Sequence, residues 1–160
     1  MTDRFPLSIS YAQIAVFDLD METPFNDWND RHYTQGFSWR EGSVSFAIPD
    51  GNRVFVEVLT DGEQSQLVGE PTRFILVPFD APNDDVAIAS ILNERSTTIG
   101  SGKYQLSFEL LPGNTRANEP YERFVRLTFS RNETPIFEII RGDSEMVIDL
   151  PLDKNAVAVK

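Results

Sequence analysis

Few residues in this chain could carry out catalytic or metal chemistry. The sequence of 160 residues holds one histidine, His32, and no cysteine. One histidine excludes metal sites built from several, and no nucleophile-elbow pattern accompanies it for a Ser-His-Asp triad. Phosphate-binding loops of the Walker or dinucleotide type are also missing. We therefore predict a protein that is not an enzyme, has no cofactor, and uses His32 as an ordinary surface or half-buried side chain.

Carboxylates are abundant, with 25 aspartates and glutamates in the chain. The pairs Asp18/Asp20 and Asp84/Asp85 could offer oxygen ligands to calcium, but their spacing lacks the ordered pattern of an EF-hand loop. We predict no metal site. A β-sandwich that binds calcium or a small ligand stays an alternative.

The acids are concentrated in one region that also carries aromatic residues. Residues 16–36 contain five acids against a single base, Arg31, and include Phe25, Trp28 and Tyr33, with Trp39 shortly after. Carboxylates steer a basic protein toward its binding site, and aromatic side chains anchor it there. The candidate partner-binding residues are Asp20, Glu22, Asp27, Trp28, Asp30 and Trp39. The competing interpretation is that the aromatic residues only hold a short helix against the fold while the acids face water.

The whole-chain charge restricts the class of partner. Lysine and arginine number 14, so the net charge is −11. A nucleic-acid-binding protein needs a basic surface, and anionic membranes would repel this chain. We expect a basic protein as the partner, with neither nucleic acid nor membrane. Neither a signal peptide nor an apolar run of membrane-spanning length is visible, which favours the cytoplasm. The charge does not indicate an oligomeric state.

The elements that must position these residues are mostly strands, because apolar residues recur with a period of two. This alternation predicts strands around residues 43–48, 54–58, 104–110, 125–129, 136–140 and 146–152. Two more short strands are expected at 73–79 and 86–92. Residues 49–52 predict a hairpin turn between the first two of these strands.

Two local features interrupt the alternation. Leu7, Ile9 and Tyr11 share one parity, whereas Ile14 and Val16 share the other, which indicates either a bulge or a strand that crosses between sheets. Residues 28–35 predict the one short helix, with Asp27 as its N-terminal cap and Gly36 as its stop. With about nine strands, the chain is expected to form an all-β antiparallel β-sandwich, a single domain over residues 1–160.

The N-terminal half resembles a known bacterial family. The resemblance lies in residues 7–17 (LSISYAQIAVF), 27–30 (DWND), Gly36 and 42–46 (GSVSF), followed by 74–79 (FILVPF) and 102–106 (GKYQL). In order and spacing these runs are similar to the competence protein J family, over roughly residues 7–111. The chain after Pro112 extends beyond that likeness.

The resemblance implies a small acidic protein that binds a metal-dependent DNA-entry nuclease and inhibits it by occluding the basic groove. It implies no catalytic residue. The alternative is an immunity-like or regulatory protein for another basic toxin or enzyme, because the same charge argument fits that partner.

Overall fold

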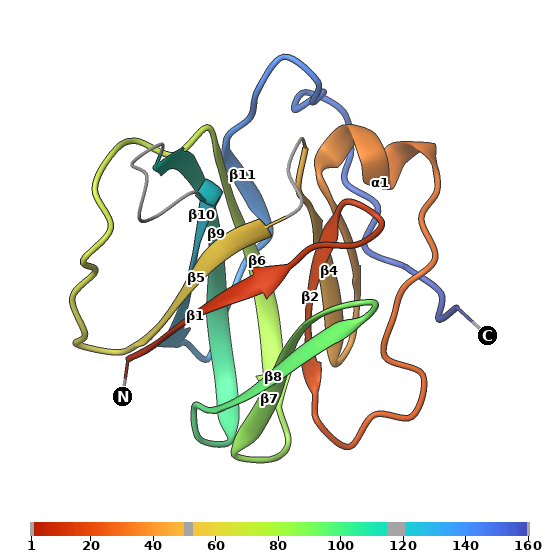
Figure 1. Cartoon of the computed structure of the whole chain (residues 1–160). Helices are drawn as coiled ribbons and strands as arrows, with labels where there is room; N and C mark the ends of the chain where they lie inside the picture. The colour runs from red at the N-terminus through yellow and green to blue at the C-terminus, as the bar shows by residue number, and fades with distance from the viewer. Residues whose placement is uncertain (1, 50–52, 115–120, 160) are drawn as a thin grey trace.

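The computed structural model describes residues 2–49, 53–114 and 121–159, and these form two β-sheets and one short helix (Figure 1). The strands are β1 (Asp3–Ser8), β2 (Gln13–Asp18), β3 (Phe37–Arg40), β4 (Ser43–Ala47), β5 (Arg53–Thr60), β6 (Arg73–Ala81), β7 (Asp85–Ser90), β8 (Asn93–Thr98), β9 (Gly102–Asn114), β10 (Tyr121–Arg131) and β11 (Glu138–Arg141), and the helix is α1 (Asp30–Gln35). A six-stranded sheet has the order β1-β5-β10-β9-β6-β11, and a five-stranded sheet has the order β3-β4-β2-β7-β8. The predicted all-β sandwich with one short helix is confirmed.

The two sheets share a core because alternate residues of each strand point between them. Phe46 on β4 stacks on Phe108 on β9, with ring centroids 4.4 Å apart, and so joins the two sheets. Burial of each such side chain stabilises the fold by about 1.5–3 kcal/mol. Tyr104 is buried, and its hydroxyl donates to the carbonyls of Ile99 (2.8 Å) and Gly100 (2.7 Å). Burial raises the pKa of Tyr104.

The change of parity near the N-terminus is a crossing from one sheet to the other. β1 pairs with β5 in the six-stranded sheet, whereas β2 pairs with β4 and β7 in the five-stranded sheet. A tight turn at Tyr11 and Ala12 joins the two strands, with φ values of 55° and 52°. Of the two interpretations left open by the sequence, the sheet crossing is therefore correct.

The predicted hairpin between residues 43–48 and 54–58 is wrong. β4 lies in the five-stranded sheet and β5 in the six-stranded one, so the two strands do not pair. In both strands, apolar and polar residues alternate because each strand turns one face toward the shared core. This alternation does not specify which strand is the hydrogen-bonded neighbour. Residues 50–52 of the predicted turn lie outside the described residues.

The helix begins later than predicted and uses a different cap. The N-cap of α1 is Asn29, whose side chain accepts a hydrogen bond from the backbone of His32, while the His32 side chain accepts one from the backbone of Asn29. This reciprocal pair satisfies two amide groups that the first turn of a helix leaves free. The carboxylate of Asp27, the predicted cap, instead accepts a hydrogen bond from the backbone amide of the next residue, Trp28. Gly36 ends the helix as predicted, with φ 87°.

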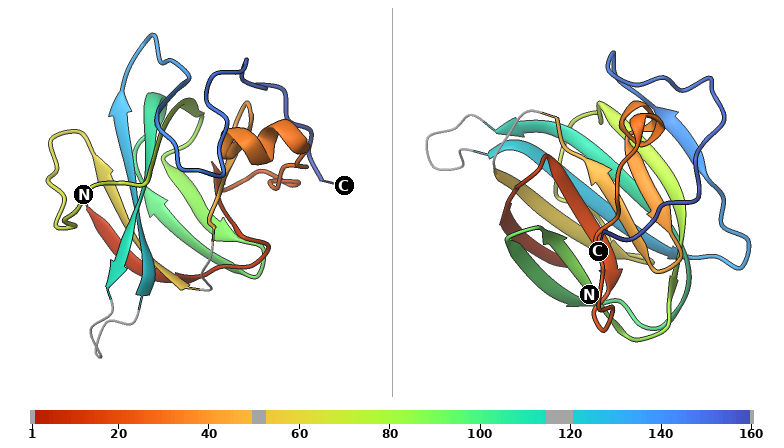
Figure 2. Two further views of the ribbon diagram at one scale, coloured as in Figure 1. Left: turned by 90° about the horizontal axis from the view of Figure 1, so that it is seen from above. Right: turned by 90° about the vertical axis from the view of Figure 1, so that its right-hand side faces the viewer.

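The C-terminal segment, residues 142–159, crosses from the six-stranded sheet to the helix and the edge strand β3 (Figures 1 and 2). The strand predicted at 146–152 is wrong, because the structure assigns none to these residues. Met146 is buried in the core, and Val147 N donates to Thr34 O. Arg73 on β6 anchors the start of the segment through a bidentate salt bridge with Asp143 (2.6 and 3.2 Å).

Arg126 on β10 is paired with a carboxylate inside the six-stranded sheet. Arg126 forms a bidentate salt bridge with Glu109 on β9 (2.9 and 2.6 Å), and it also donates to Ser65 Oγ. The hydrogen bond from Glu109 is the main reason that the pKa of Arg126 is raised. The buried carboxylate of Glu57 accepts from Arg4 and from Ser65 beside this pair. These charges are therefore neutralised within the six-stranded sheet and the loop against it.

Candidate partner-binding face

The acidic segment, residues 18–30, packs across the outer face of the five-stranded sheet. Phe25 contacts Phe17 edge to face with ring centroids 5.6 Å apart, and Met21 packs against the same small cluster of Phe17 and alanines on β2 and β7. These apolar contacts hold the segment against the sheet, so its carboxylates are carried by a fixed backbone and not by a free loop.

A buried asparagine fixes the middle of the acidic segment. Asn26 Nδ2 donates to the carbonyls of Ser38 (2.8 Å) and Ser43 (3.1 Å), and its Oδ1 accepts from Arg40 Nε (2.6 Å). Arg40 also donates to the carbonyl of Thr23, and Ser38 Oγ donates to Asp27 O. A buried side chain with this many satisfied hydrogen bonds specifies a single backbone position.

The structure separates the predicted site residues into two groups. The side chain of Trp28 lies beside the start of β2, where its indole Nε1 donates to Gln13 Oε1 (3.2 Å). Asp27 and Asp30 are close to Trp28 in the chain. Asp20 lies past the other end of β2, where Asn83 donates to both Asp18 and Asp20, and Glu22 follows two residues later. A six-residue strand spans about 17 Å, and the two acidic groups lie at opposite ends of β2, the central strand of the five-stranded sheet.

Trp39 takes part in packing between the sheets. Its indole Nε1 donates to Pro78 O on β6 (2.7 Å), and its ring contacts Phe137 edge to face at 4.8 Å. The side chain is half-buried and packs against the core. The structure thus gives Trp39 a role in joining β3 to the six-stranded sheet, and its contact with a partner stays a prediction.

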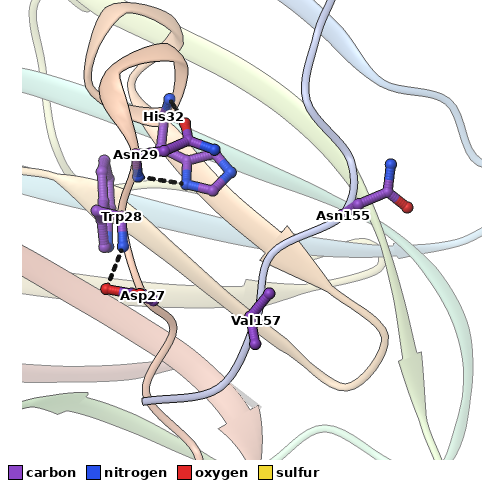
Figure 3. Close-up of a pocket in the computed structure, with 6 residues that line it drawn as sticks. All are labelled: Asp27, Trp28, Asn29, His32, Asn155 and Val157. Carbon is purple, nitrogen blue, oxygen red and sulfur yellow. Dashed lines mark hydrogen bonds between the residues drawn. The ribbon is translucent and has the colours of Figure 1, made fainter.

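A small hollow lies between the acidic segment and the C-terminal segment (Figure 3). It is lined by Asp27, Trp28, Asn29, His32, Asn155 and Val157, and has a volume of about 90 Å³. The two segments run side by side there, since Asp27 N donates to Val157 O (2.7 Å) and Val159 N donates to Phe25 O (2.9 Å). The C-terminal segment therefore helps to fix Asp27 and Trp28.

His32 lies deeper than predicted, with 2% of its surface exposed. Its Nδ1 accepts from Asn29 N (3.1 Å), so in the neutral ring the proton is on Nε2, which lies 3.4 Å from Asp153 Oδ2. Asn29 Nδ2 donates to the same carboxylate (2.9 Å), and Asn155 N donates to its other oxygen (2.9 Å). These hydrogen bonds, the one from Asn29 first, lower the pKa of Asp153. His32 thus has a structural role in the helix cap.

The described part of the chain offers neither a cluster of metal ligands nor a membrane-spanning helix. Within residues 2–49, 53–114 and 121–159, no group of three or more histidine, aspartate or glutamate side chains could hold a metal ion. Among the helices of those same residues, none has the length and apolar character needed to cross a bilayer.

Sequence reasoning missed several residues that build this face. Asn26 and Arg40 are polar residues without a recognisable motif, and their role depends on contacts with strands distant in sequence. Arg31 was counted as a lone base, yet its guanidinium donates to the carbonyls of Val147, Leu150 and Pro151. Tyr11 was grouped by parity with Leu7 and Ile9, whereas the structure places it, exposed, in the turn after β1.

Comparisons with known proteins agree with this architecture. The DNA-entry nuclease inhibitor of Bacillus subtilis (strain 168) is 32% identical over 107 residues, which cover 66% of this chain and 80% of the relative. The crystal structure of ComJ from Bacillus subtilis, described as the inhibitor of the DNA-degrading activity of NucA, superposes with a TM-score of 0.70 at 24% identity. That match covers 81% of this chain and 96% of the other, and it shows a shared fold.

The family assignment rests on the extent of the sequence match. The sequence model of competence protein J (ComJ) matches residues 6–130, which extends beyond the predicted resemblance over residues 7–111. The relatives carry the names of an inhibitor and not of an enzyme, in agreement with the predicted class. β11 and the C-terminal segment follow the matched region. This chain is a member of the competence protein J (ComJ) family.

Proposed function

We propose that this protein binds a metal-dependent nuclease of the DNA-entry type and inhibits it by covering the basic groove that holds DNA. The observation that carries the proposal is the relative in Bacillus subtilis, a DNA-entry nuclease inhibitor that this chain matches over 80% of its length. Family members can change partners while they keep the fold, so the activity needs its own test.

The charge of the chain supports a basic partner. The net charge is −11, and a nuclease that binds DNA must present positive charge to phosphates. Carboxylates placed where phosphates would lie can compensate that positive charge and exclude the substrate. Asp27 and Asp30 at one end of β2, and Asp20 and Glu22 at the other, are the carboxylates that we assign to this role.

The rigidity of the acidic segment supports tight binding. Asn26 and Arg40 hold the segment by hydrogen bonds, and Phe25 holds it by packing. A surface that is already ordered loses less conformational entropy on association, so more of the interaction energy contributes to affinity. A standard interface covers about 800 Å² on each partner, enough to include both acidic groups.

The test is inhibition of purified NucA, the nuclease that ComJ of Bacillus subtilis inhibits. DNA cleavage is measured with equimolar protein at a low salt concentration of about 50 mM, and again at about 500 mM, where charge–charge attraction is screened. We expect strong inhibition at low salt and weaker inhibition at high salt. A complex that forms without loss of cleavage would favour a regulatory role, and the absence of any binding at low salt would overturn the proposal.

A further inference from the structure

The turn between β1 and β2 displays an aromatic side chain on an unfavourable backbone. Tyr11 and Ala12 both have left-handed φ values, of 55° and 52°. Glycine or asparagine normally occupies such positions, because a Cβ atom makes this conformation costly. The Tyr11 side chain is 77% exposed, so packing into the core does not account for it. Strained backbone of this kind concentrates at functional sites, where its geometry serves binding.

Tyr11 belongs to a small hollow with two other aromatic residues. The hollow is shallow and opens to solvent, with a volume of about 20 Å³, and it is lined by Tyr11, Ala12, Gln13, Trp28, Tyr33 and Ala47. The rings of Trp28 and Tyr33 lie 5.2 Å apart at an angle of 42°. Trp28 is held by its hydrogen bond to Gln13, whereas Tyr33 on α1 is 62% exposed. The space admits only a small group such as the charged tip of one side chain, and it is too small for a helix or a strand.

The charges around this hollow select the kind of side chain. Asp27 precedes Trp28 in the chain, and Asp30 lies one helical turn before Tyr33, on the same side of α1. Both carboxylates are exposed. Arg31 keeps its positive charge, but its guanidinium lies against the C-terminal segment, where it donates to three carbonyls. None of the six lining residues is charged, so Asp27, which lines the neighbouring hollow, and Asp30 act on this one from outside its lining.

We propose that the hollow between Tyr11, Trp28 and Tyr33 is a cage for one cationic side chain, an arginine or a lysine, of the nuclease. This inference rests on the proposed function, and it names the point of contact. Aromatic rings attract a cation through their negative faces, and nearby carboxylates strengthen the attraction. The hydrogen bond from Trp28 to Gln13 and the tight turn at Tyr11 fix the backbone positions of two of the three aromatic residues before the partner arrives.

Substitutions at Tyr33 distinguish a cation from an apolar occupant. Tyr33→Phe keeps the aromatic ring, Tyr33→Leu keeps apolar bulk without the ring, and Tyr33→Ala removes both. The dissociation constant of the complex with NucA is measured for each, together with thermal unfolding. We expect Tyr33→Phe to bind within about twofold of the unaltered protein, and Tyr33→Leu and Tyr33→Ala to bind roughly tenfold more weakly.

Two further variants complete the series. Tyr11→Asn suits the left-handed turn and removes the ring, so it should also weaken binding roughly tenfold without loss of stability. Val68→Ser alters a side chain that is 85% exposed in the loop against the six-stranded sheet, and it should bind normally. Normal binding by Tyr33→Leu would mean an apolar occupant and would overturn the cage, as would equal losses in Tyr33→Phe and Tyr33→Ala.

The cationic residue can be located from the side of the nuclease. Exposed arginines and lysines of NucA are replaced by alanine one at a time and tested against the unaltered protein and Tyr33→Ala. One position should lose most of its effect in the Tyr33→Ala background, as expected for two side chains in contact. If NucA binds but no position couples, the cage is wrong while the proposed function stands. If NucA does not bind at all, both fall.

Discussion

Single side chains decide how the acidic segment is displayed. Asn26 bonds to two carbonyls on different strands, and Arg40 bonds to Asn26 and to the backbone of Thr23. Asp153 performs a similar function from the C-terminal segment, where it accepts from Asn29 at the helix cap. These residues do not need to contact a partner. They fix the backbone on which Asp27, Trp28 and Asp30 are carried.

Asp153 provides a prediction at the scale of one residue. Its pKa is lowered in the fold, so its contribution to stability is present above the ordinary aspartate pKa of about 3.9 and is lost as the pH falls below that value. Asp153→Asn should lower the free energy of unfolding by about 1 kcal/mol at neutral pH, since the carboxylate is partly exposed.

The measurement is chemical denaturation of both proteins at neutral pH and at about pH 2.5, below the ordinary carboxyl range. The difference between them should shrink at the lower pH, because the carboxylate of the unaltered protein is then becoming protonated. A difference that stays constant between the two pH values would show that the charge of Asp153 does not contribute.

At the scale of elements, the C-terminal segment joins parts of the molecule that are distant in sequence. Ala156 N donates to Trp39 O on β3, Val147 N donates to Thr34 O on α1, and Val157 O accepts from Asp27 N. The segment follows the region matched by the family model, yet it forms one side of the hollow beside Trp28. The candidate face therefore depends on an element outside the matched residues.

Arg31 provides the prediction for this element. Its three hydrogen bonds to the carbonyls of Val147, Leu150 and Pro151 should be lost in Arg31→Met, which keeps much of the apolar stem. We expect faster hydrogen exchange at the amides of Val147 and Ala156, and a loss of about 1–2 kcal/mol in stability.

Arg31→Lys serves as the control for charge. A lysine keeps the positive charge, but its compact ammonium group cannot reproduce the planar arrangement of donors that reaches three carbonyls. Exchange should therefore be intermediate in this variant. Unchanged exchange in Arg31→Met would mean that the backbone contacts alone hold the C-terminal segment.

For the whole molecule, the position of charge is as important as its total. Arg126 and Arg73 are neutralised by carboxylates within the fold, at Glu109 and Asp143. Several acids of residues 18–30 are exposed in contrast, including Asp20, Glu22, Asp27 and Asp30. A local excess of one sign raises the rate of encounter with an oppositely charged protein more than it slows dissociation.

A pair of double variants tests this steering. Asp27→Asn with Asp30→Asn removes two charges beside Trp28, and Glu94→Gln with Glu133→Gln removes two exposed charges elsewhere. The association rate with NucA at low salt should fall about three- to tenfold for the first pair and less for the second, and the difference should fade at high salt. Equal falls for both pairs would indicate that only the net charge matters.

The sequence by itself determined the class of the fold and the composition of the candidate face. Apolar and polar residues alternate in strands such as 104–110 because one face of the strand packs on the core and the other faces outward. This alternation follows from local backbone geometry and can be recognised without knowing the neighbouring strands. The parity change before Ile14 likewise marked an interruption of the first strand, but strand pairing was needed to distinguish a sheet crossing from a bulge. The stop of the helix at Gly36 was predictable because a left-handed residue there favours glycine.

Tertiary structure decided which strands are neighbours and which polar residues matter. Period-two alternation is the same whether a strand pairs with the next strand or with one in the other sheet, so the separation of β4 from β5 left no trace in the sequence. Asn26, Arg31 and Asp153 gain their roles only when distant segments meet, because a hydrogen bond depends on a distance and an angle that no residue spacing specifies.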